Sequence, residues 1–441
     1  MPTQDATKVT SETAPASTDA KPSERALEVL WQNAHTLAGG LVTEEGRRIR
    51  VLYPGRVNRR AGPDFRDAVI ATESGERIAG DVELHLSAPD WYAHRHDADP
   101  NYNGVVLHVV LWPKGGKVSR QRSSMEVPVA SIAGVELDIG QVRPVHVGGL
   151  ADLEALDSPA LGQALARAGD ERFRARCEGF ALELTEDGPD QVLYRALMDS
   201  LGYATNRKPF RELAERAPFA SLVSLRQEPA STRALALRAT LTATAGLLSH
   251  VRPPEEARQL RRLHRVIRGS SALKGDRMRP SAGKAMARAQ WNLFRVRPSN
   301  NPVRRIAGAA VLVDGFIDNG PARALESDIL SLSPRQLVRR LTVPKAIGVG
   351  RAADMVVNVL LPFFGAYAGF RGSRQLHGRC TELYRAFPRL ADNEITREMA
   401  RLLGRDAVEA AVAGARAQQG LMHVYRKIAV DSQTSADEGP F

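Results

Sequence analysis

The sequence predicts an α/β N-terminal domain, with a mixed sheet flanked by helices, followed by a large all-α C-terminal region. Three observations lead to this fold class. Up to about residue 147, short apolar runs alternate with turn residues. One of them, VVLHVVLW, is continuous enough for a strand buried on both faces. Beyond residue 151, long segments rich in Ala, Leu, Arg and Glu have helical periodicity. The 441 residues, 43% of them apolar, suffice for more than one core.

The first expected element is a helix that begins at Ser23, a suitable N-cap, and ends at Gly39-Gly40. Leu27 and Trp31 belong to its apolar stripe. Strands are then expected in RIRVLYPG (48–55), DFRDAVIATESG (64–75) and ERIAGDVELHL (76–86), with the polar RVNRRAGP (56–63) as a loop. The turn at Ser74-Gly75 favours an antiparallel hairpin between the second and third of these strands.

A short helix is expected to begin at Pro89, because proline fits the first turn of a helix. The buried strand VVLHVVLW (105–112) follows, and the strand-like segments MEVPVASI (125–132) and VELDI (135–139) complete this unit. The predicted organisation is a disordered tail (1–22), the α/β domain (23–147), helical domains (151–430) and a polar tail (431–441).

The bulk composition narrows the classes of function. The formal net charge is +11, which favours polyanionic partners such as nucleic acid. Only two cysteines are present, which excludes a disulfide framework and a Cys-rich zinc module and fits a reducing cytoplasm. The N-terminal tail has no apolar core of signal-peptide length. The most apolar segment, MVVNVLLPFFGAYAGF (355–370), is too short to span a membrane and is expected as a buried helix, so no membrane partner is expected.

The predicted hairpin carries an unusual number of ionisable residues. Side chains alternate along a strand, so Asp81, Glu83 and His85 share one face. Asp64 begins the paired strand, where the hairpin brings it close to Glu83. Two converging carboxylates repel each other unless one is protonated or a cation lies between them. Mg²⁺ or Mn²⁺ fits such a pair, and one of the waters on the ion can attack a phosphodiester.

The order of these elements and motifs resembles the core of the PD-(D/E)XK nuclease superfamily, which has a restriction-endonuclease-like fold. Pro63-Asp64 and then Glu83-Leu84-His85 stand where that superfamily has its PD and (D/E)XK motifs. The resemblance implies that Asp64, Glu83 and the main-chain carbonyl of Leu84 bind the metal ion. It also implies that an acid of the first helix completes the site, and Glu24 and Glu28 are the candidates. His85 replaces the usual Lys and would act as base, metal ligand or phosphate contact.

Four of the ten histidines lie within 24 residues: His85, His94, His96 and His108. A zinc site formed by His85, His94, His96 and Asp99 is one alternative, and ordinary polar or phosphate-facing roles are the other. We expect His108, inside a buried strand, to be either a hydrogen-bonded core histidine or a residue that hydrogen-bonds and orients a metal ligand. Asp81 is expected either to hydrogen-bond a metal ligand or to be a turn residue after Gly80.

Residues 258–305 hold 14 Lys or Arg residues and one acid, Asp276. The alternatives for this segment are a solvated basic face and a surface that follows a phosphate backbone. The residues assigned to nucleic-acid contact are Arg261, Arg262, Arg265, Arg268, Arg295 and Arg297. In DNEITREM (392–399), Asp392 or Asn393 is expected to cap a helix.

Most of the chain is also similar to a bacterial family of unknown function, through GPDF, GDVELH, DWYAHRHDADPNYNGVVLHVV, FRVRPSNNPVRRIA, DNEITREM and QQGLMHVY. The leading hypothesis is a cytoplasmic, metal-dependent endo- or exonuclease that acts on DNA or RNA, with DNA the more expected of the two. The runner-up is a nucleic-acid-binding protein without activity on a nuclease-like scaffold, favoured by the missing Lys. A zinc-dependent hydrolase of another kind is the third.

Overall fold

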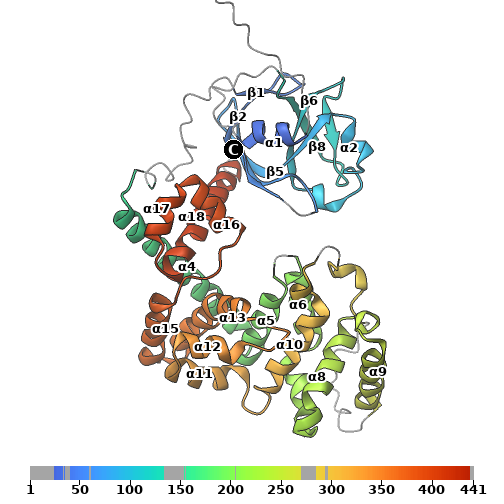
Figure 1. The fold of residues 1–441 in the computed structure, drawn as a ribbon, viewed down its shortest axis with the longest axis vertical. Coiled ribbons are helices and arrows are strands. Elements are labelled where there is room, and N and C mark those ends of the chain that lie inside the picture. Colours follow the sequence, from blue (N-terminus) through green and yellow to red (C-terminus); the bar gives the residue numbers. More distant parts are fainter. Residues whose placement is uncertain are drawn as a thin grey trace, which may run out of the picture. The chain divides into compact units, whose positions relative to one another are not determined.

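The computed structural model describes residues 24–32, 34, 40–58, 61–133, 153, 155–203, 205–269, 285–293 and 296–437, without the side chains of residues 29, 268 and 428–437. The chain divides into two compact units (Figure 1). The first, here called the sheet unit, comprises residues 1–151 and 427–441. The second, the helical unit, comprises residues 152–426. This division agrees with the predicted fold class, an α/β region followed by a large all-α region.

The sheet unit contains the expected elements and three very short strands. Its elements are α1 (Glu24–Gln32), β1 (Leu41–Val42), β2 (Arg48–Tyr53), β3 (Arg56–Val57), β4 (Phe65–Thr72), β5 (Arg77–Ser87), α2 (Asp90–Ala93), the 3₁₀ turn η2 (Pro100–Tyr102), β6 (Val105–Trp112), β7 (Val118–Arg120) and β8 (Glu126–Ser131). The strands β1, β3 and β7 were not expected from the sequence, because two or three residues are too few to establish an alternating pattern. Ser23 and the expected strand at 135–139 lie outside the described residues.

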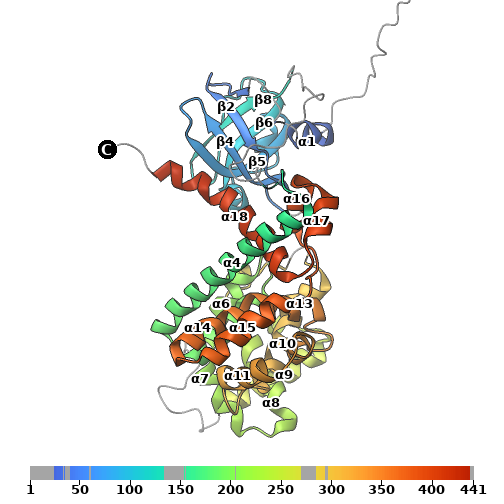
Figure 2. The same cartoon turned by 90° about the vertical axis from the view of Figure 1, so that its left-hand side faces the viewer.

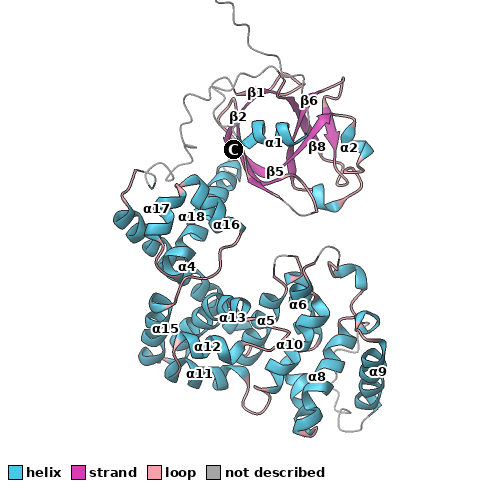
Figure 3. Ribbon diagram, in the orientation of Figure 1, coloured by secondary structure: helices cyan, strands magenta, loops and turns pink. Residues whose placement is uncertain are grey.

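Within the described residues the strands form one eight-stranded sheet in the order β1-β2-β4-β5-β6-β8-β7, with β3 beside β4. The β4–β5 pair is the antiparallel hairpin predicted from the turn at Gly75. Both β5–β6 and β6–β8 are parallel, so the sheet is mixed. Figures 2 and 3 show these strands side by side, with β5 and β6 at the centre of the sheet.

Helix α1 packs on one face of this sheet. Its residues Leu27 and Trp31 belong to the same buried cluster as Val82 and Leu84 of β5 and Leu107 of β6. Because side chains alternate along a strand, the residues between these apolar ones point to the opposite face. Glu83, His85 and His108 are therefore on the face away from α1, and that face holds the candidate site.

The described part of the helical unit consists of α-helices with a few 3₁₀ and π-helical turns (Figure 3). Its helices are α4 (Ser158–Glu186), α5 (Pro189–Leu201), α6 (Arg207–Arg216), α7 (Phe219–Leu222), α8 (Ala230–Thr244), α9 (Pro254–Gly269), α10 (Pro302–Asp314), α11 (Pro321–Ser331), α12 (Pro334–Leu341), α13 (Val349–Met355), α14 (Leu361–Arg371), α15 (Arg374–Ala386), α16 (Glu394–Leu402), α17 (Arg405–Ala411) and α18 (Ala415–Asp437). The last of these helices, α18, extends beyond the helical unit, because its residues from Lys427 on belong to the sheet unit. It continues into the expected polar tail, where the segment up to Asp437 contains neither Gly nor Pro to end it.

The apolar segment of the helical unit lies in its core, as predicted. The prediction that this segment is too short to span a membrane is wrong, because the helical run Val349–Arg371, formed by α13, a π-helical turn (Val356–Leu360) and α14, is longer than 355–370. This run is long and apolar enough to span a membrane, but most of it is buried inside the protein. Its fully buried side chains include Met355, Phe363 and Phe364. A burial of this kind is typical of the core helix of a globular unit.

Helix α16 begins at the N-cap predicted from DNEITREM. The Asn393 side chain accepts a hydrogen bond of 3.0 Å from the Thr396 main-chain N–H, and the Thr396 hydroxyl accepts one of 2.9 Å from the Asn393 N–H. Asn393→Ala is expected to lower the unfolding free energy of the helical unit by about 1 kcal/mol, because it leaves an N–H at the helix start without its acceptor. Denaturant unfolding followed by Trp291 fluorescence measures this change, with Asn393→Asp, which keeps the cap, as the control.

Candidate metal centre

Asp64 and Glu83 lie side by side on neighbouring strands. Asp64 directly precedes β4, and Glu83 is in the middle of β5. The register pairs Phe65 with Val82, which places Asp64 opposite Glu83 on the face away from α1. The segment before Asp64 is fixed by Asn58, whose side-chain amide donates to the Pro63 carbonyl (2.8 Å) and whose N–H donates to the Asp64 carbonyl (2.7 Å).

Each of the two carboxyl groups accepts a hydrogen bond from the main chain of the other strand. The Asp64 N–H donates to Glu83 Oε2 (3.0 Å), and the Leu84 N–H donates to Asp64 Oδ2 (3.1 Å). These reciprocal bonds hold both side chains in place and use one oxygen of each. The other oxygens, Asp64 Oδ1 and Glu83 Oε1, accept no hydrogen bond from the residues that the structure describes.

Burial makes ionisation of both carboxyl groups unfavourable. Burial, then the negative charge of Glu83 and to a smaller extent those of Glu24 and Glu28 on α1, raise the pKa of Asp64 to about 7, although the hydrogen bond from the Leu84 N–H opposes this shift. Burial also raises the pKa of Glu83 to about 8, although the hydrogen bond from the Asp64 N–H opposes this shift. At neutral pH, a positive charge placed beside two acids in this state favours their full ionisation. The pair is therefore suited to a cation.

His85 lies between a buried histidine and an exposed one. Its Nδ1 is 2.9 Å from His108 Nε2, and its Nε2 is 3.0 Å from His94 Nδ1. His108 Nδ1 is in turn 2.8 Å from the Ser119 hydroxyl on β7. Burial, and next the charge of His108, lower the pKa of His85 to about 3. Burial, and then the charge of His96, lower the pKa of His108 to about 3. Both rings are therefore neutral at physiological pH, and each N–H···N contact has one donor and one acceptor.

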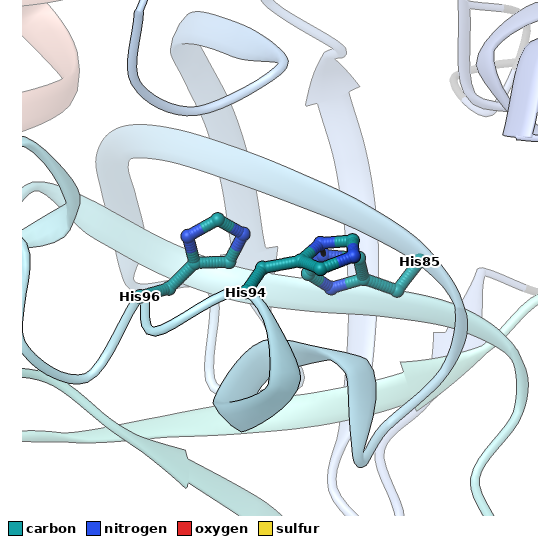
Figure 4. A group of neighbouring side chains, drawn as sticks. All are labelled: His85, His94 and His96. Carbon is teal, nitrogen blue, oxygen red and sulfur yellow. Dashed lines mark hydrogen bonds between the residues drawn. The ribbon is translucent and has the colours of Figure 1, made fainter.

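His96 completes a group of histidines above β5. One nitrogen each of His85, His94 and His96 lies within 4.8 Å of the others, and Figure 4 shows the three rings grouped together. Glu83 Oε1 is 3.1 Å from His96 Nε2 and 3.6 Å from His85 Nε2. His85 belongs to β5, whereas His94 and His96 follow α2.

Aromatic rings hold His96 in position. Tyr102 stacks on His96 with ring centroids 3.8 Å apart, and Trp91 contacts it edge-on at 5.5 Å. Trp91 is itself fixed by a hydrogen bond from its Nε1 to the Arg120 carbonyl (2.9 Å). Asp99, the fourth residue of the alternative zinc site, caps η2, because its side chain accepts a hydrogen bond from the Asn101 N–H. Among the described residues, the carboxylate next to His85 and His96 is that of Glu83.

Arg66 lies next to the predicted site residues but was not itself predicted from the sequence. It lies on β4, two residues after Asp64, and pairs with Asp81 on β5. Burial raises the pKa of Asp81, while the charge of Arg66 opposes that shift. The positive charge of the same guanidinium also opposes the rise in the pKa of Glu83. The alternation along FRD could have indicated Arg66, but its role depends on the bulge between Phe65 and Ala68, where Asp67 has φ +59°.

The remaining predicted residues are placed as follows. Glu24 is exposed on α1 and Glu28 is half-buried, and both act electrostatically on Asp64. Leu84 contacts the pair through its N–H, which binds Asp64. Ser119 was not foreseen, because a three-residue strand gives no sequence signal.

The arginines that the sequence assigns to nucleic-acid contact belong to the helical unit. Arg261, Arg262 and Arg265 are exposed on α9, whose opposite face buries Ala257 and Leu260. None of these three arginines forms an ion pair with an acid in the described part of the chain. Arg297 is exposed just before η8 (Pro298–Asn300). Arg295 and the side chain of Arg268 lie outside the described residues.

Comparison with known proteins places the chain in a family. No curated protein and no solved structure matches it. A family model described as "Protein of unknown function (DUF2851)" matches residues 24–319, which is more than half of the 441 residues and includes every residue of the metal centre. The chain therefore belongs to the DUF2851 family.

Proposed function

We propose that the sheet unit is a divalent-metal-dependent phosphodiester hydrolase that cuts nucleic acid, built on a PD-(D/E)XK-like core. The observation that carries this proposal is the pair of Asp64 and Glu83. One carboxylate oxygen of each accepts a hydrogen bond from the main chain of the other strand, and the second oxygen of each accepts none from the described residues. The element order, a helix followed by a mixed sheet whose central strand carries Glu83 and His85, is compatible with that core.

The residues present fit a divalent cation. The raised pKa values of Asp64 and Glu83 mean that a cation would displace protons and meet two carboxylates at fixed positions. Both residues would hold the ion, which, when bound, supplies Lewis-acid activation of the phosphate and a more acidic water. Mg²⁺ and Mn²⁺ are the ions that a carboxylate pair of this kind accepts.

Two other side chains are assigned roles in the reaction. His85 replaces the Lys of the resembled motif and is only 1% exposed, so we assign it to proton transfer or metal binding rather than to phosphate contact. Its Nε2 is 3.0 Å from Nδ1 of His94, which is exposed. Arg66 supplies the permanent positive charge beside the carboxyl pair that a Lys would otherwise provide.

The exposed arginines of α9 are assigned to the phosphate backbone of the substrate, with DNA preferred over RNA. Arg261, Arg262 and Arg265 offer guanidinium groups that have no acidic partner among the described residues. Contacts of this kind make binding strongly dependent on salt and independent of base sequence. A cytoplasmic location fits the two free cysteines, Cys177 and Cys380.

A metal titration tests the proposal. The full-length protein is stripped with EDTA and incubated with labelled single-stranded, duplex and branched DNA, and with RNA, while Mg²⁺ or Mn²⁺ is added. We expect cleavage that appears only with the ion and is lost again on chelation. Salt-sensitive binding without cleavage of any substrate would refute the enzymatic proposal and favour the non-catalytic nucleic-acid-binding protein.

A further inference from the structure

We propose that His85, His94 and His96, together with Glu83, bind a first-row transition-metal ion, with Zn²⁺ as the best match. This inference places a second ion next to the carboxylate site proposed above, and the binding of this ion does not require that the protein cuts nucleic acid. The position is adjacent to the Asp64–Glu83 pair, because Glu83 Oε2 faces Asp64 and Glu83 Oε1 faces the histidines.

The spacing of the donor atoms fits one small ion. Three of the separations are 3.0 Å (His85 Nε2 to His94 Nδ1), 3.1 Å (His96 Nε2 to Glu83 Oε1) and 3.6 Å (His85 Nε2 to Glu83 Oε1). Ligands at about 2.0–2.1 Å in a tetrahedron around zinc are roughly 3.3 Å from one another. The three nitrogens lie within 4.8 Å of each other, so small side-chain rotations close the set.

His96 provides an independent indication that a ligand is missing from the group. It is 7% exposed, and its Nε2 is buried without a hydrogen-bond partner among the residues that the structure describes. Glu83 Oε1 is near, but the contact lacks hydrogen-bond geometry. A buried polar nitrogen without a partner is costly, and coordination to a metal ion would satisfy it.

The buried nitrogen of His85, Nδ1, has a hydrogen-bond partner, as the second nitrogen of a metal-binding histidine usually does. A ligating imidazole usually donates its second N–H to an acceptor behind it, which fixes the tautomer and the ring orientation. Here His85 Nδ1 faces His108 Nε2, and His108 Nδ1 faces the Ser119 hydroxyl. If His85 donates to His108 and His108 donates to Ser119, the lone pair on His85 Nε2 points toward Glu83 and His94.

The chemical nature of the four ligand atoms determines which metal ions fit the site. Three imidazole nitrogens and one carboxylate oxygen suit Zn²⁺, Co²⁺, Fe²⁺ or Ni²⁺, whereas Mg²⁺ prefers oxygen ligands and keeps several waters.

Binding of Co²⁺ and Zn²⁺ to the full-length, EDTA-treated protein tests the inference without an activity assay. We expect one Zn²⁺ per chain by isothermal titration calorimetry. We also expect Co²⁺ to give the intense visible absorption of a four-coordinate site, which Zn²⁺ abolishes. His94→Gln and His96→Gln should each weaken Zn²⁺ binding at least about tenfold. His94 is exposed, so its replacement leaves the core intact.

His377→Gln and Asp99→Asn serve as matched controls, because His377 is an exposed histidine on α15 and Asp99 caps η2. His108→Leu, which removes the acceptor behind His85, should weaken binding by about 10–100-fold, while both controls bind as the wild type does. The inference is overturned if the wild type shows no saturable Zn²⁺ or Co²⁺ binding, or if His94→Gln and His96→Gln bind like the controls. Zn²⁺ binding without cleavage would refute only the proposed hydrolase, and Mg²⁺-dependent cleavage without Zn²⁺ binding would refute only the histidine site.

Discussion

Asp64→Asn is expected to lower the metal-dependent cleavage rate by on the order of 100-fold or more, the size typical when a group that stabilises developing charge is removed. Asparagine keeps the shape of the side chain and can still accept the hydrogen bond from the Leu84 N–H through its carbonyl oxygen. It loses the negative charge that pairs with a cation. Initial cleavage rates at saturating Mg²⁺ or Mn²⁺ measure the effect.

Asp97→Asn is the matched control for this variant. Asp97 lies in the loop next to His96 and undergoes the same chemical change, but no hydrogen bond or ion pair joins it to another described residue. Its rate should stay within about twofold of the wild type. An Asp64→Asn protein that cuts as fast as the Asp97→Asn protein would remove Asp64 from the mechanism.

The metal-free protein is expected to lose about 2 kcal/mol of unfolding free energy between about pH 6.5 and pH 8. The pKa values of Asp64 and Glu83 are raised to about 7 and about 8, so the folded state holds protons that the unfolded state has already released. The contribution of these groups to stability is fully present below their unfolded pKa values, near 4, and is lost as the pH rises through 7 and 8.

The histidines act in the opposite direction and at lower pH. The pKa values of His85 and His108 are lowered to about 3, so their contribution is complete above their unfolded value near 6.5 and is lost as the pH falls toward 3. Below about pH 6.5 the two effects partly cancel. The window from pH 6.5 to pH 8 therefore isolates the carboxyl pair, and an added divalent ion should restore the stability lost there.

Fluorescence can report on the sheet unit alone. Of the four tryptophans, Trp31, Trp91 and Trp112 lie in the sheet unit and Trp291 in the helical unit. In a Trp291→Phe background, urea unfolding at several pH values gives the stability of the sheet unit within the whole chain. The Asp64→Asn/Glu83→Gln double variant should be nearly independent of pH in this window. A wild type that is equally flat would show that the two carboxyl groups titrate normally.

Features that depend on neighbouring residues in the chain could be predicted from the sequence. The alternation in GDVELH placed Glu83 and His85 on one face of β5, and the turn at Gly75 set the hairpin that brings Asp64 opposite Glu83. The Asn393 N-cap and the burial of the apolar segment 355–370 follow from equally local patterns. Each of these depends on a repeat of two or of 3.6 residues, or on one hydrogen bond across three residues.

Contacts between distant residues depended on the three-dimensional packing. His108 faces His85 because β5 and β6 pair in parallel with a shift at Asp81, and Ser119 reaches His108 from a strand of three residues. Glu83 rather than Asp99 faces the histidines because the loop after α2 folds back over β5 against Trp91 and Tyr102. Strand order and loop closure are set by how the whole core packs, and no periodic pattern along the chain encodes them.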